Sequence, residues 1–450
     1  MKYDQFNHHK AWVVAVDMGY GHQRAAYPLK RLAEGGKIIN ANNYLGIPTA
    51  DKKKWDESRS FYEFISRFKN VPVIGEAAFK AYDHFQEIPQ FYPKRDLSEP
   101  TFQLKQMYRM IHNGWGKHLI NKLEKKKHLP MITTFFLPAF MAEEHGFSEE
   151  IYCVICDADI SRTWVPPDPT KSRINYFAPC YRVVDRLKFY GVDPNRIYLT
   201  GFPLPVENIG DSDLNILKAD FANRLMNLDP RRRYLSRYKK TITEQLHPVK
   251  LPKKSDHILT LTFAIGGAGA QKDLGLQIVK SLSNFIVHKR IAVNLVAGIH
   301  NDVNQYFKKN IKDLGLGKEL GHGIKTIFAE SKEEYFKKFN HALRTTDILW
   351  TKPSELSFYV ALGLPIIIAP SIGSQEDFNR LWLRTIGAGI NQENPAYTSE
   401  WLFDWVKSGW FARSAMQGFL EGPRFGTYNM AKIISKKMKE VHVMKPALQY

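Results

Sequence analysis

The sequence predicts an α/β protein of two domains, each built on a parallel β-sheet. Short apolar runs of the buried-strand type alternate with helix-length segments in two separate parts of the chain, at residues 130–200 and 257–389. The 450 residues are enough for two hydrophobic cores. The hydrophobic content of 44% with 24% charged residues is that of an ordinary folded protein.

The first predicted strand, Ala11–Val16, runs into a glycine-rich turn and then a helix to about residue 33. Gly19 and Gly21 permit a tight turn with positive φ before a helix N-terminus. A Gly-x-Gly turn is typical of dinucleotide-binding proteins, but here the third glycine is missing. The next strand ends in Asn40 and Asn42 rather than in an acidic residue, so we do not expect a dehydrogenase.

Residues 50–130 interrupt the alternation with a segment rich in aromatic and basic residues. Helices packed on the first sheet, with solvated lysines, are the ordinary interpretation. The alternation then resumes, and strands are expected at Met131–Phe136, Ile151–Cys156, Tyr176–Ala178 and Arg196–Thr200.

The three cysteines do not make a disulfide framework, which fits a reducing compartment. Cys153 and Cys156 have CxxC spacing but lie in an apolar strand without a second ligand pair, so we expect buried thiols. Asp157 and Asp159 spell a DxD metal motif, which is a weak signal because two carboxylates at this spacing are common in loops.

The balance of 64 Lys+Arg against 45 Asp+Glu gives a net charge of +19, which favours anionic partners. The most basic segment is 206–256, either a solvated connector or a patch for acidic lipid headgroups. It holds few aromatic residues, so nucleic acid is not an expected partner. No apolar run of ~18 residues and no signal peptide is found, so we expect a cytoplasmic protein with at most peripheral membrane contact.

The second domain is expected to open with the strand His257–Ala264, followed by a glycine-rich turn and a helix from about Asp273. Gly266, Gly267 and Gly269 let backbone N–H groups approach a phosphate, and the helix N-terminus favours negative charge. The turn therefore predicts anion binding. Further strands are expected at Ile291–Ala297 and Ile324–Ala329.

The stretch Asp347–Gly389 reads as strand, helix, strand, helix. The first helix is expected at Ser354–Leu362, and Ser374 with Asp377 resembles a capping box for the second. Ligands of open parallel sheets bind outside the carboxyl ends of the strands, so we expect a site here. The polar residues that gather at these ends are Lys352, Ser354, Glu355, Ser374, Gln375, Glu376 and Asn379.

The order Lys-Pro, helix, Gly-Leu-Pro, then Gln-Glu and Asn before Gly-Ala-Gly resembles the donor half of GT-B glycosyltransferases. The similar family contains monogalactosyldiacylglycerol synthase and the peptidoglycan lipid N-acetylglucosaminyltransferase (glycosyltransferase family 28-like). The turn Gly19–Arg24, the loop Asp157–Trp164 and the passage 190–205 resemble further motifs of it. The resemblance implies a GT-B fold of two Rossmann-like doubly wound domains facing a cleft, with a C-terminal helix crossing back to the first domain.

The resemblance also implies a division into an acceptor-side domain (1–205, with the insertion at about 50–130), a connector (206–256), a donor domain (257–410) and C-terminal helices (411–450). The implied activity is transfer of a sugar from a nucleotide-diphosphate sugar, with UDP as the expected nucleotide, to a lipid or other acceptor hydroxyl at a membrane surface. Neither a metal nor a cofactor is expected.

By match to the family, His22 or Asp157 would act as the base, and Gly19, Gly21 and Arg24 would form the acceptor-side loop. The expected donor-binding residues are Gly266, Gly267, Gly269, His300, Phe328, Lys352, Ser354, Glu355, Gln375, Glu376 and Asn379.

The sequence departs from the family pattern in two ways. Ser354 and Glu355 stand where glycines usually follow Lys-Pro, and Phe358 replaces a glutamate that holds the ribose. We hypothesise that Glu355, one helical turn earlier, substitutes for it. A catalytically silent GT-B-like protein that binds a nucleotide or a lipid, or a nucleotide-sugar 2-epimerase, remains an alternative.

Overall fold

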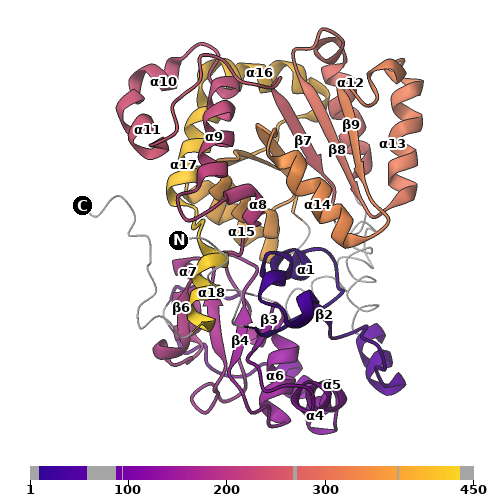
Figure 1. The fold of residues 1–450 in the computed structure, drawn as a ribbon, viewed down its shortest axis with the longest axis vertical. Coiled ribbons are helices and arrows are strands. Elements are labelled where there is room, and N and C mark those ends of the chain that lie inside the picture. The colour runs from indigo at the N-terminus through magenta and orange to yellow at the C-terminus, as the bar shows by residue number, and fades with distance from the viewer. Residues whose placement is uncertain (1–9, 58–87, 94, 267–270, 372–373, 436–450) are drawn as a thin grey trace.

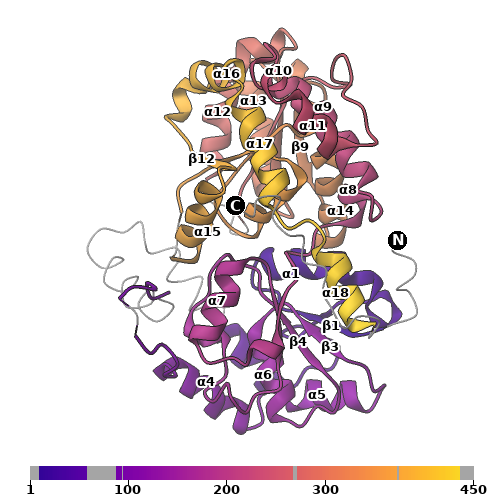
Figure 2. The same cartoon turned by 90° about the vertical axis from the view of Figure 1, so that its left-hand side faces the viewer.

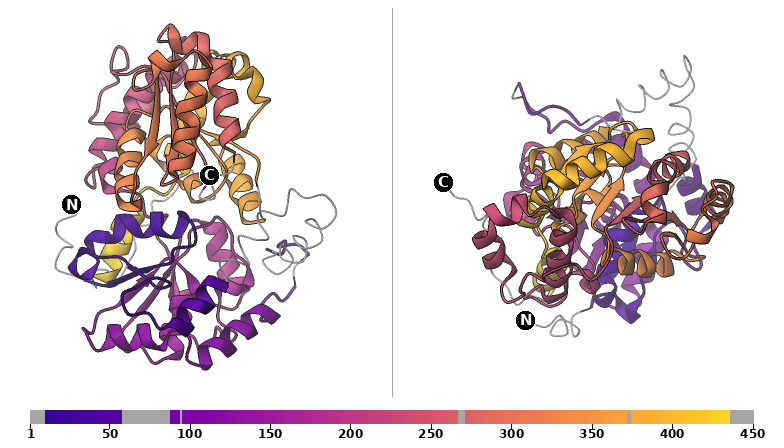
Figure 3. Two further views of the ribbon diagram at one scale, coloured as in Figure 1. Left: turned by 90° about the vertical axis from the view of Figure 1, so that its right-hand side faces the viewer. Right: turned by 90° about the horizontal axis from the view of Figure 1, so that it is seen from above.

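Two six-stranded parallel sheets, one in each domain, organise the chain in the computed structural model (Figure 1). The residues that the structure describes are 10–57, 88–93, 95–266, 271–371 and 374–435. The two domains are stacked along the long axis, with the first below and the second above (Figures 2 and 3). The predicted fold class is confirmed.

The first sheet has the strand order β2-β1-β3-β4-β5-β6, and all neighbours are parallel. Every residue of β1, β3, β4 and β5 is buried, because helices cover both faces. The strands are β1 (Trp12–Ala15), β2 (Ile39–Asn40), β3 (Met131–Thr133), β4 (Ile151–Val154), β5 (Asn175–Ala178) and β6 (Ile197–Leu199). The main helices are α1 (Gly21–Ala26), α4 (Phe102–His112), α5 (Lys117–Glu124), α6 (Phe136–Glu144) and α7 (Tyr181–Phe189).

The aromatic and basic insertion is described only in part, because residues 58–87 and 94 lie outside the described residues. Its helices α4 and α5 pack on α6, which in turn packs on β3 and β4. These helices therefore form an outer layer rather than lying directly on the sheet.

The second sheet has the order β12-β11-β10-β7-β8-β9 and is also parallel. Its strands are β7 (Thr260–Ala264), β8 (Ala292–Gly298), β9 (Ile324–Phe328), β10 (Ile348–Thr351), β11 (Ile366–Ile368) and β12 (Gly389–Asn391). The helices are α12 (Lys272–Val287), α13 (Asn301–Asp313), α14 (Lys332–Leu343), α15 (Ser374–Thr385) and α16 (Thr398–Ser408), and a 3₁₀ helix, η7, spans Glu355–Leu362.

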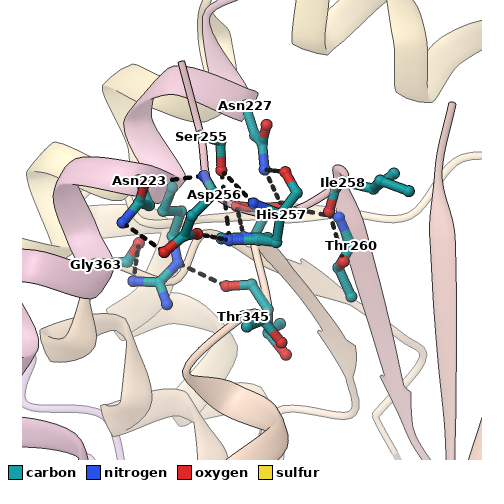
Figure 4. A network of polar contacts seen from close by, with 12 residues as sticks. Asn223, Asn227, Ser255, Asp256, His257, Ile258, Thr260, Thr345 and Gly363 are labelled. Carbon is teal, nitrogen blue, oxygen red and sulfur yellow. Dashed lines mark hydrogen bonds and ion pairs between the residues drawn. The ribbon is translucent and has the colours of Figure 1, made fainter. Parts of the chain in front are cut away.

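A buried polar network ties the start of β7 to the start of β10 (Figure 4). The Asp347 carboxylate accepts hydrogen bonds from the Thr260 N–H (2.8 Å) and from Asn227 Nδ2 (2.9 Å), and it lies 3.2 Å from His257 Nε2. The His257 Nδ1 lies 2.6 Å from Asp256. Burial alone would lower the pKa of His257, but the two carboxylates outweigh it and raise this pKa.

The connector packs on the second domain through a buried arginine. It consists of α8 (Val206–Ile209), α9 (Asn215–Leu228), α10 (Arg233–Arg237) and α11 (Lys239–Leu246). Arg224 on α9 is 2% exposed and donates to the carbonyls of Leu343, Thr346 and Leu362. Leu343 is the last residue of α14, Thr346 follows it, and Leu362 is the last residue of η7. One guanidinium therefore fixes α9 to the ends of both helices.

The last two described helices lie on different domains. Helix α17 (Trp410–Glu421) packs on η7, whereas α18 (Gly426–Ile434) lies on the first domain (Figure 2). The Thr427 hydroxyl donates to the Leu204 carbonyl (2.6 Å), and Asn429 donates to the Thr200 carbonyl (2.8 Å). The chain thus crosses back to the first domain, as a GT-B arrangement requires.

Two predicted helix details were wrong, and a third is not tested. The helix expected to run to about residue 33 leaves α geometry after Ala26, where Pro28 lacks an N–H to continue it. The helix expected at 354–362 is a 3₁₀ helix confined between Pro353 and the left-handed Gly363. Helix α15 begins at Ser374, and Asp377 accepts a hydrogen bond from the Ser371 hydroxyl (2.6 Å). The Ser374 side chain lies outside the described part of the structure, so the predicted capping box stays a prediction.

Candidate functional site

The candidate site lies at the seam between the domains, where loops at the carboxyl ends of both sheets meet. The segments after β1 and β4 come from the first domain, and those after β8, β9, β10 and β11 come from the second. Side-chain contacts that cross the seam at this edge include Asp17–Lys332, Tyr20–Ile299, Arg24–Glu355 and Asp157–Asn379. The sequence predicted both halves of this site separately, and the structure brings them together.

Arg24 and Glu355 form a buried ion pair across the seam. Arg24 Nε lies 3.1 Å from Glu355 Oε1, and the side chains are 3% and 11% exposed. Arg24 also donates to the Tyr335 hydroxyl (2.8 Å), and its guanidinium lies 4.6–5.3 Å from the ring centroids of Tyr335, Phe336 and Phe339. Arg24 therefore holds the first domain to α14 and η7, and its guanidinium is buried in contacts with these two elements.

Gly21 makes room for the Glu355 carboxylate. A Cβ at this position would lie 3.3 Å from Glu355 Oε2, so a side chain here would press on the ion pair. Gly19 has a φ of +109°, which a residue other than glycine rarely adopts, and it lies in open space. The two glycines thus serve different purposes: Gly19 turns the chain, and Gly21 admits Glu355.

His22 is held on the first domain by Thr134. Its Nδ1 lies 2.8 Å from the Thr134 carbonyl, so Nδ1 carries the proton and Nε2 is left as the acceptor. The Thr134 hydroxyl donates back to the His22 carbonyl (2.8 Å), and the Phe135 ring lies 4.7 Å from the imidazole. Burial lowers the pKa of His22 to about 4, so the ring is neutral at pH 7.

Asp157 follows β4 and bonds directly to the second domain. Asn379 Nδ2 donates to Asp157 Oδ1 (2.9 Å), while the Asn379 side-chain oxygen accepts from the Ala158 N–H (2.7 Å). Burial raises the pKa of Asp157 to about 6; the charges of Glu355 and Glu376 push it the same way, and the Asn379 bond opposes them. The carboxyl group therefore titrates close to neutral pH.

Asp159 has a different role from Asp157, although the two are separated by one residue. Its buried carboxylate accepts from Arg182 Nε (2.6 Å) and from Arg186 Nε (2.8 Å) and Nη2 (3.0 Å). Arg182 and Arg186 thus occupy both oxygens of the second carboxylate in the DxD pattern. Among the described residues, no group of three His, Cys, Asp or Glu side chains could hold a metal ion.

The three cysteines are buried and unpaired, as predicted for structural thiols. Burial raises the pKa of Cys153, Cys156 and Cys180 above the ordinary thiol value, which disfavours the reactive thiolate.

Lys352 lies between the glycine-rich turn and α15. Its ammonium pairs with the Glu376 carboxylate, and a Cβ at Gly266 would lie 2.6 Å from Lys352 Cε. Gly266 is therefore required for the approach of Lys352 to the turn after β7. Gly267 and Gly269 lie outside the described residues. Ser354 and Gln375, which lie close to Lys352 and Glu376 in the sequence, are partly buried.

The remaining predicted donor residues lie on the loops after β8 and β9. The His300 ring packs edge-on against Tyr20 of the first domain, with 6.3 Å between centroids. Phe328 ends β9 and is partly buried. Phe358 is 2% exposed and lies against Phe202 and Trp382, each at 5.0 Å between centroids, so this position packs between segments of both domains.

Sequence reasoning missed Tyr20 and the Asp17–Lys332 pair. The Tyr20 hydroxyl accepts a hydrogen bond from the Ile299 N–H (3.0 Å), and a Cβ at Gly298 would lie 2.3 Å from it. The sequence did contain a signal for Tyr20. It is a large aromatic residue between two glycines of a tight turn, where a bulky side chain is expected to pack against another segment.

Together, the sheets, the seam and the returning helix define a GT-B-type α/β protein. A family model described as "Domain of unknown function (DUF6938)" matches residues 251–322, the start of the second domain. None of the curated proteins matches the chain. Within the described residues, every helix falls short of the length and apolar character that a membrane span needs.

Several solved structures align with much of this chain at low sequence identity. MurG from Acinetobacter baumannii is 12% identical with a TM-score of 0.48, over 95% of this chain and 99% of that one. UDP-GlcNAc 2-epimerase from Neisseria meningitidis, bound to UDP-GlcNAc, is 13% identical with a TM-score of 0.45, over 75% and 82%. A putative UDP-N-acetylglucosamine 2-epimerase from Listeria monocytogenes is 12% identical with a TM-score of 0.45, over 77% and 84%.

Proposed function

We propose that the chain is a glycosyltransferase that moves a sugar from a nucleotide-diphosphate sugar to an acceptor hydroxyl. UDP is the expected nucleotide, and a lipid at a membrane surface is the expected acceptor. The observation that carries the proposal is Asp157, a carboxyl group with a pKa near 6 that the first domain presents to Asn379 of the second. A base works best when its pKa is near the operating pH.

Asp157 suits the base role better than His22. At pH 7 a group with a pKa of about 6 is mostly deprotonated and still accepts a proton, whereas His22, at about 4, is a much weaker base. In the proposed step, the acceptor oxygen bonds to the anomeric carbon as the bond from that carbon to the diphosphate breaks. The acceptor proton passes to Asp157, and the nucleoside diphosphate leaves with the electron pair.

Lys352 would stabilise the negative charge that develops on the leaving diphosphate. Its present partner is Glu376, so donor binding would exchange one carboxylate for the phosphates on the same ammonium. Glu376 would then turn to the sugar hydroxyls together with Gln375. The turn that begins at Gly266 would add backbone N–H groups at the start of α12.

One observation favours a nucleotide-sugar 2-epimerase as the second candidate. The charges of Glu355 and Glu376 on the second domain both raise the pKa of Asp157 on the first. A 2-epimerase moves a proton off and back onto C2, which calls for titratable groups and for no acceptor.

The test is to incubate the protein with UDP-sugars, with and without glycolipid acceptors, and to identify products by mass spectrometry and NMR. Acceptor-dependent release of UDP with a glycosylated product supports transfer, and Asp157→Asn should abolish it. Asp168→Asn, on an exposed loop of the same domain, is the matched control and should retain the rate. Inversion at C2 without acceptor would replace the proposal by the epimerase. No turnover with any UDP-sugar would favour a silent binding protein.

A further inference from the structure

A cavity of about 640 Å³ opens at the seam, and none of the candidate-site residues lines it. We call it the hinge pocket and define it by Lys30, Arg31, Glu207, Lys337, Asn340 and Arg344. Its walls come from the 3₁₀ helix η2 (Tyr27–Arg31) of the first domain and from α8 and α14 on the other side. The volume falls in the range of small-molecule sites, roughly 300–1,000 Å³.

Positive charge dominates the lining. Lys30, Arg31, Lys337 and Arg344 are cationic, and Glu207 is the carboxylate among the lining residues. The Nζ atoms of Lys30 and Lys337 lie 2.6 Å and 3.3 Å from Oε1 of Glu333. Two ammonium groups thus share one carboxylate, which leaves one positive charge in excess. Pairs this exposed are worth about 0–1 kcal/mol, so an incoming phosphate can replace them at little cost.

One lining residue, Asn340, has a buried acceptor atom without a hydrogen-bond partner in the described part of the chain. Asn340 is 1% exposed, and its Nδ2 donates to Glu207 (2.9 Å), but its Oδ1 has no hydrogen-bond partner among the described residues. An unsatisfied buried acceptor is costly, and a hydroxyl group is the donor that would satisfy it. The partly buried ring of Tyr27 adds an apolar surface to the same lining.

We propose that the hinge pocket binds a phosphorylated, hydroxyl-bearing small molecule, a sugar phosphate or a mononucleotide. The phosphate binds between Lys30, Arg31 and Lys337, and a hydroxyl of the ligand donates to Asn340. Because Lys30 and Lys337 lie on different domains, the ligand bridges the seam and holds η2 against α14. The site is independent of the activity proposed above.

A contact path joins the hinge pocket to the candidate site. The ring of Tyr27 packs against Phe336 at 5.5 Å, and Phe336 lies 4.9 Å from the Arg24 guanidinium, which pairs with Glu355. A ligand that fixes η2 against α14 therefore also restrains Arg24 and Glu355, which join the two domains at the candidate site.

The experiment is isothermal titration of the full chain with glucose 6-phosphate, UMP and orthophosphate. Lys337→Glu should weaken binding of the organic phosphates about tenfold or more, because it replaces a charge-assisted hydrogen bond by repulsion. Lys338→Glu is the matched control. Lys338 follows Lys337 on α14, its side chain is half exposed, and it does not line the hinge pocket. Lys352→Ala tests whether binding occurs at the candidate site instead.

The expected result is binding of glucose 6-phosphate that Lys337→Glu weakens and that Lys338→Glu and Lys352→Ala leave unchanged. For UMP, which can also enter the proposed donor site, the expected result is binding that persists in Lys352→Ala and that Lys337→Glu weakens. The inference is overturned by no binding of any probe, by equal weakening in Lys337→Glu and Lys338→Glu, or by loss of binding in Lys352→Ala alone. Orthophosphate binding as tight as that of glucose 6-phosphate and UMP would overturn the assigned contact between a ligand hydroxyl and Asn340.

Discussion

The substitution Arg24→Met tests whether the buried ion pair holds the two domains together. Methionine keeps the length of the apolar stem but removes the charge that Glu355 faces. The carboxylate, only 11% exposed, would then be buried without a partner. Breaking a buried pair in this way costs about 3–5 kcal/mol. Because Glu355 keeps some solvent contact, we expect a loss of about 3 kcal/mol in the free energy of unfolding.

The assay is urea unfolding followed by tryptophan fluorescence, with Lys30→Met as the matched control. Lys30 also pairs across the seam, with Glu333 at 2.6 Å, but these side chains are 36% and 50% exposed. An exposed pair contributes about 0–1 kcal/mol, so the control should lose no more than that. In a double-mutant cycle, Glu355→Gln should recover part of the loss caused by Arg24→Met. Equal losses for Arg24→Met and Lys30→Met, or an absence of coupling to Glu355, would refute the reasoning.

Three further predictions concern pH and packing. The rate of transfer should rise between about pH 5 and pH 7, because Asp157 must lose its proton with a pKa of about 6; a rate independent of pH in this range would exclude it as the base. The pKa of His257 is raised by folding, so its contribution to stability is complete below about pH 6.5 and is lost as the pH rises through the folded value. Thermal unfolding across this range should show the decline, and His257→Gln should flatten it. Gly363→Ala should cost about 2–4 kcal/mol, because φ is +67° and the new Cβ would lie 2.4 Å from the Phe221 ring; Gly315→Ala, with positive φ in open space, should cost less than half of this in the same thermal assay.

The sequence predicted most of the fold because its strands are short apolar runs between clear turn signals. Each strand of the first sheet begins within two residues of its expected start, and β7 begins three residues later than expected. β12 was not predicted, because its Gly389–Asn391 segment lacks an apolar run. The α-helix predicted at 354–362 was wrong because this mostly apolar segment carries no helical periodicity, and Pro353 and Gly363 on either side confine it to a 3₁₀ helix.

The candidate site could be predicted only in halves. The polar residues at strand ends were visible in the sequence, but contacts such as Arg24–Glu355 join positions more than 300 residues apart, and no spacing rule connects them. Tertiary packing also decided what each residue does. Phe358 stands at the position where the family places a glutamate, yet in this chain it stacks on Phe202 from the first domain.

The most direct test of the account is acceptor-dependent release of UDP from a UDP-sugar, measured for the unmodified chain and for Asp157→Asn. The account predicts that the unmodified chain releases UDP only when an acceptor is present and that the variant, although folded, does not. UDP release that is unchanged in Asp157→Asn would contradict the assignment of the base, and the absence of release with every UDP-sugar and acceptor would contradict the proposed activity itself.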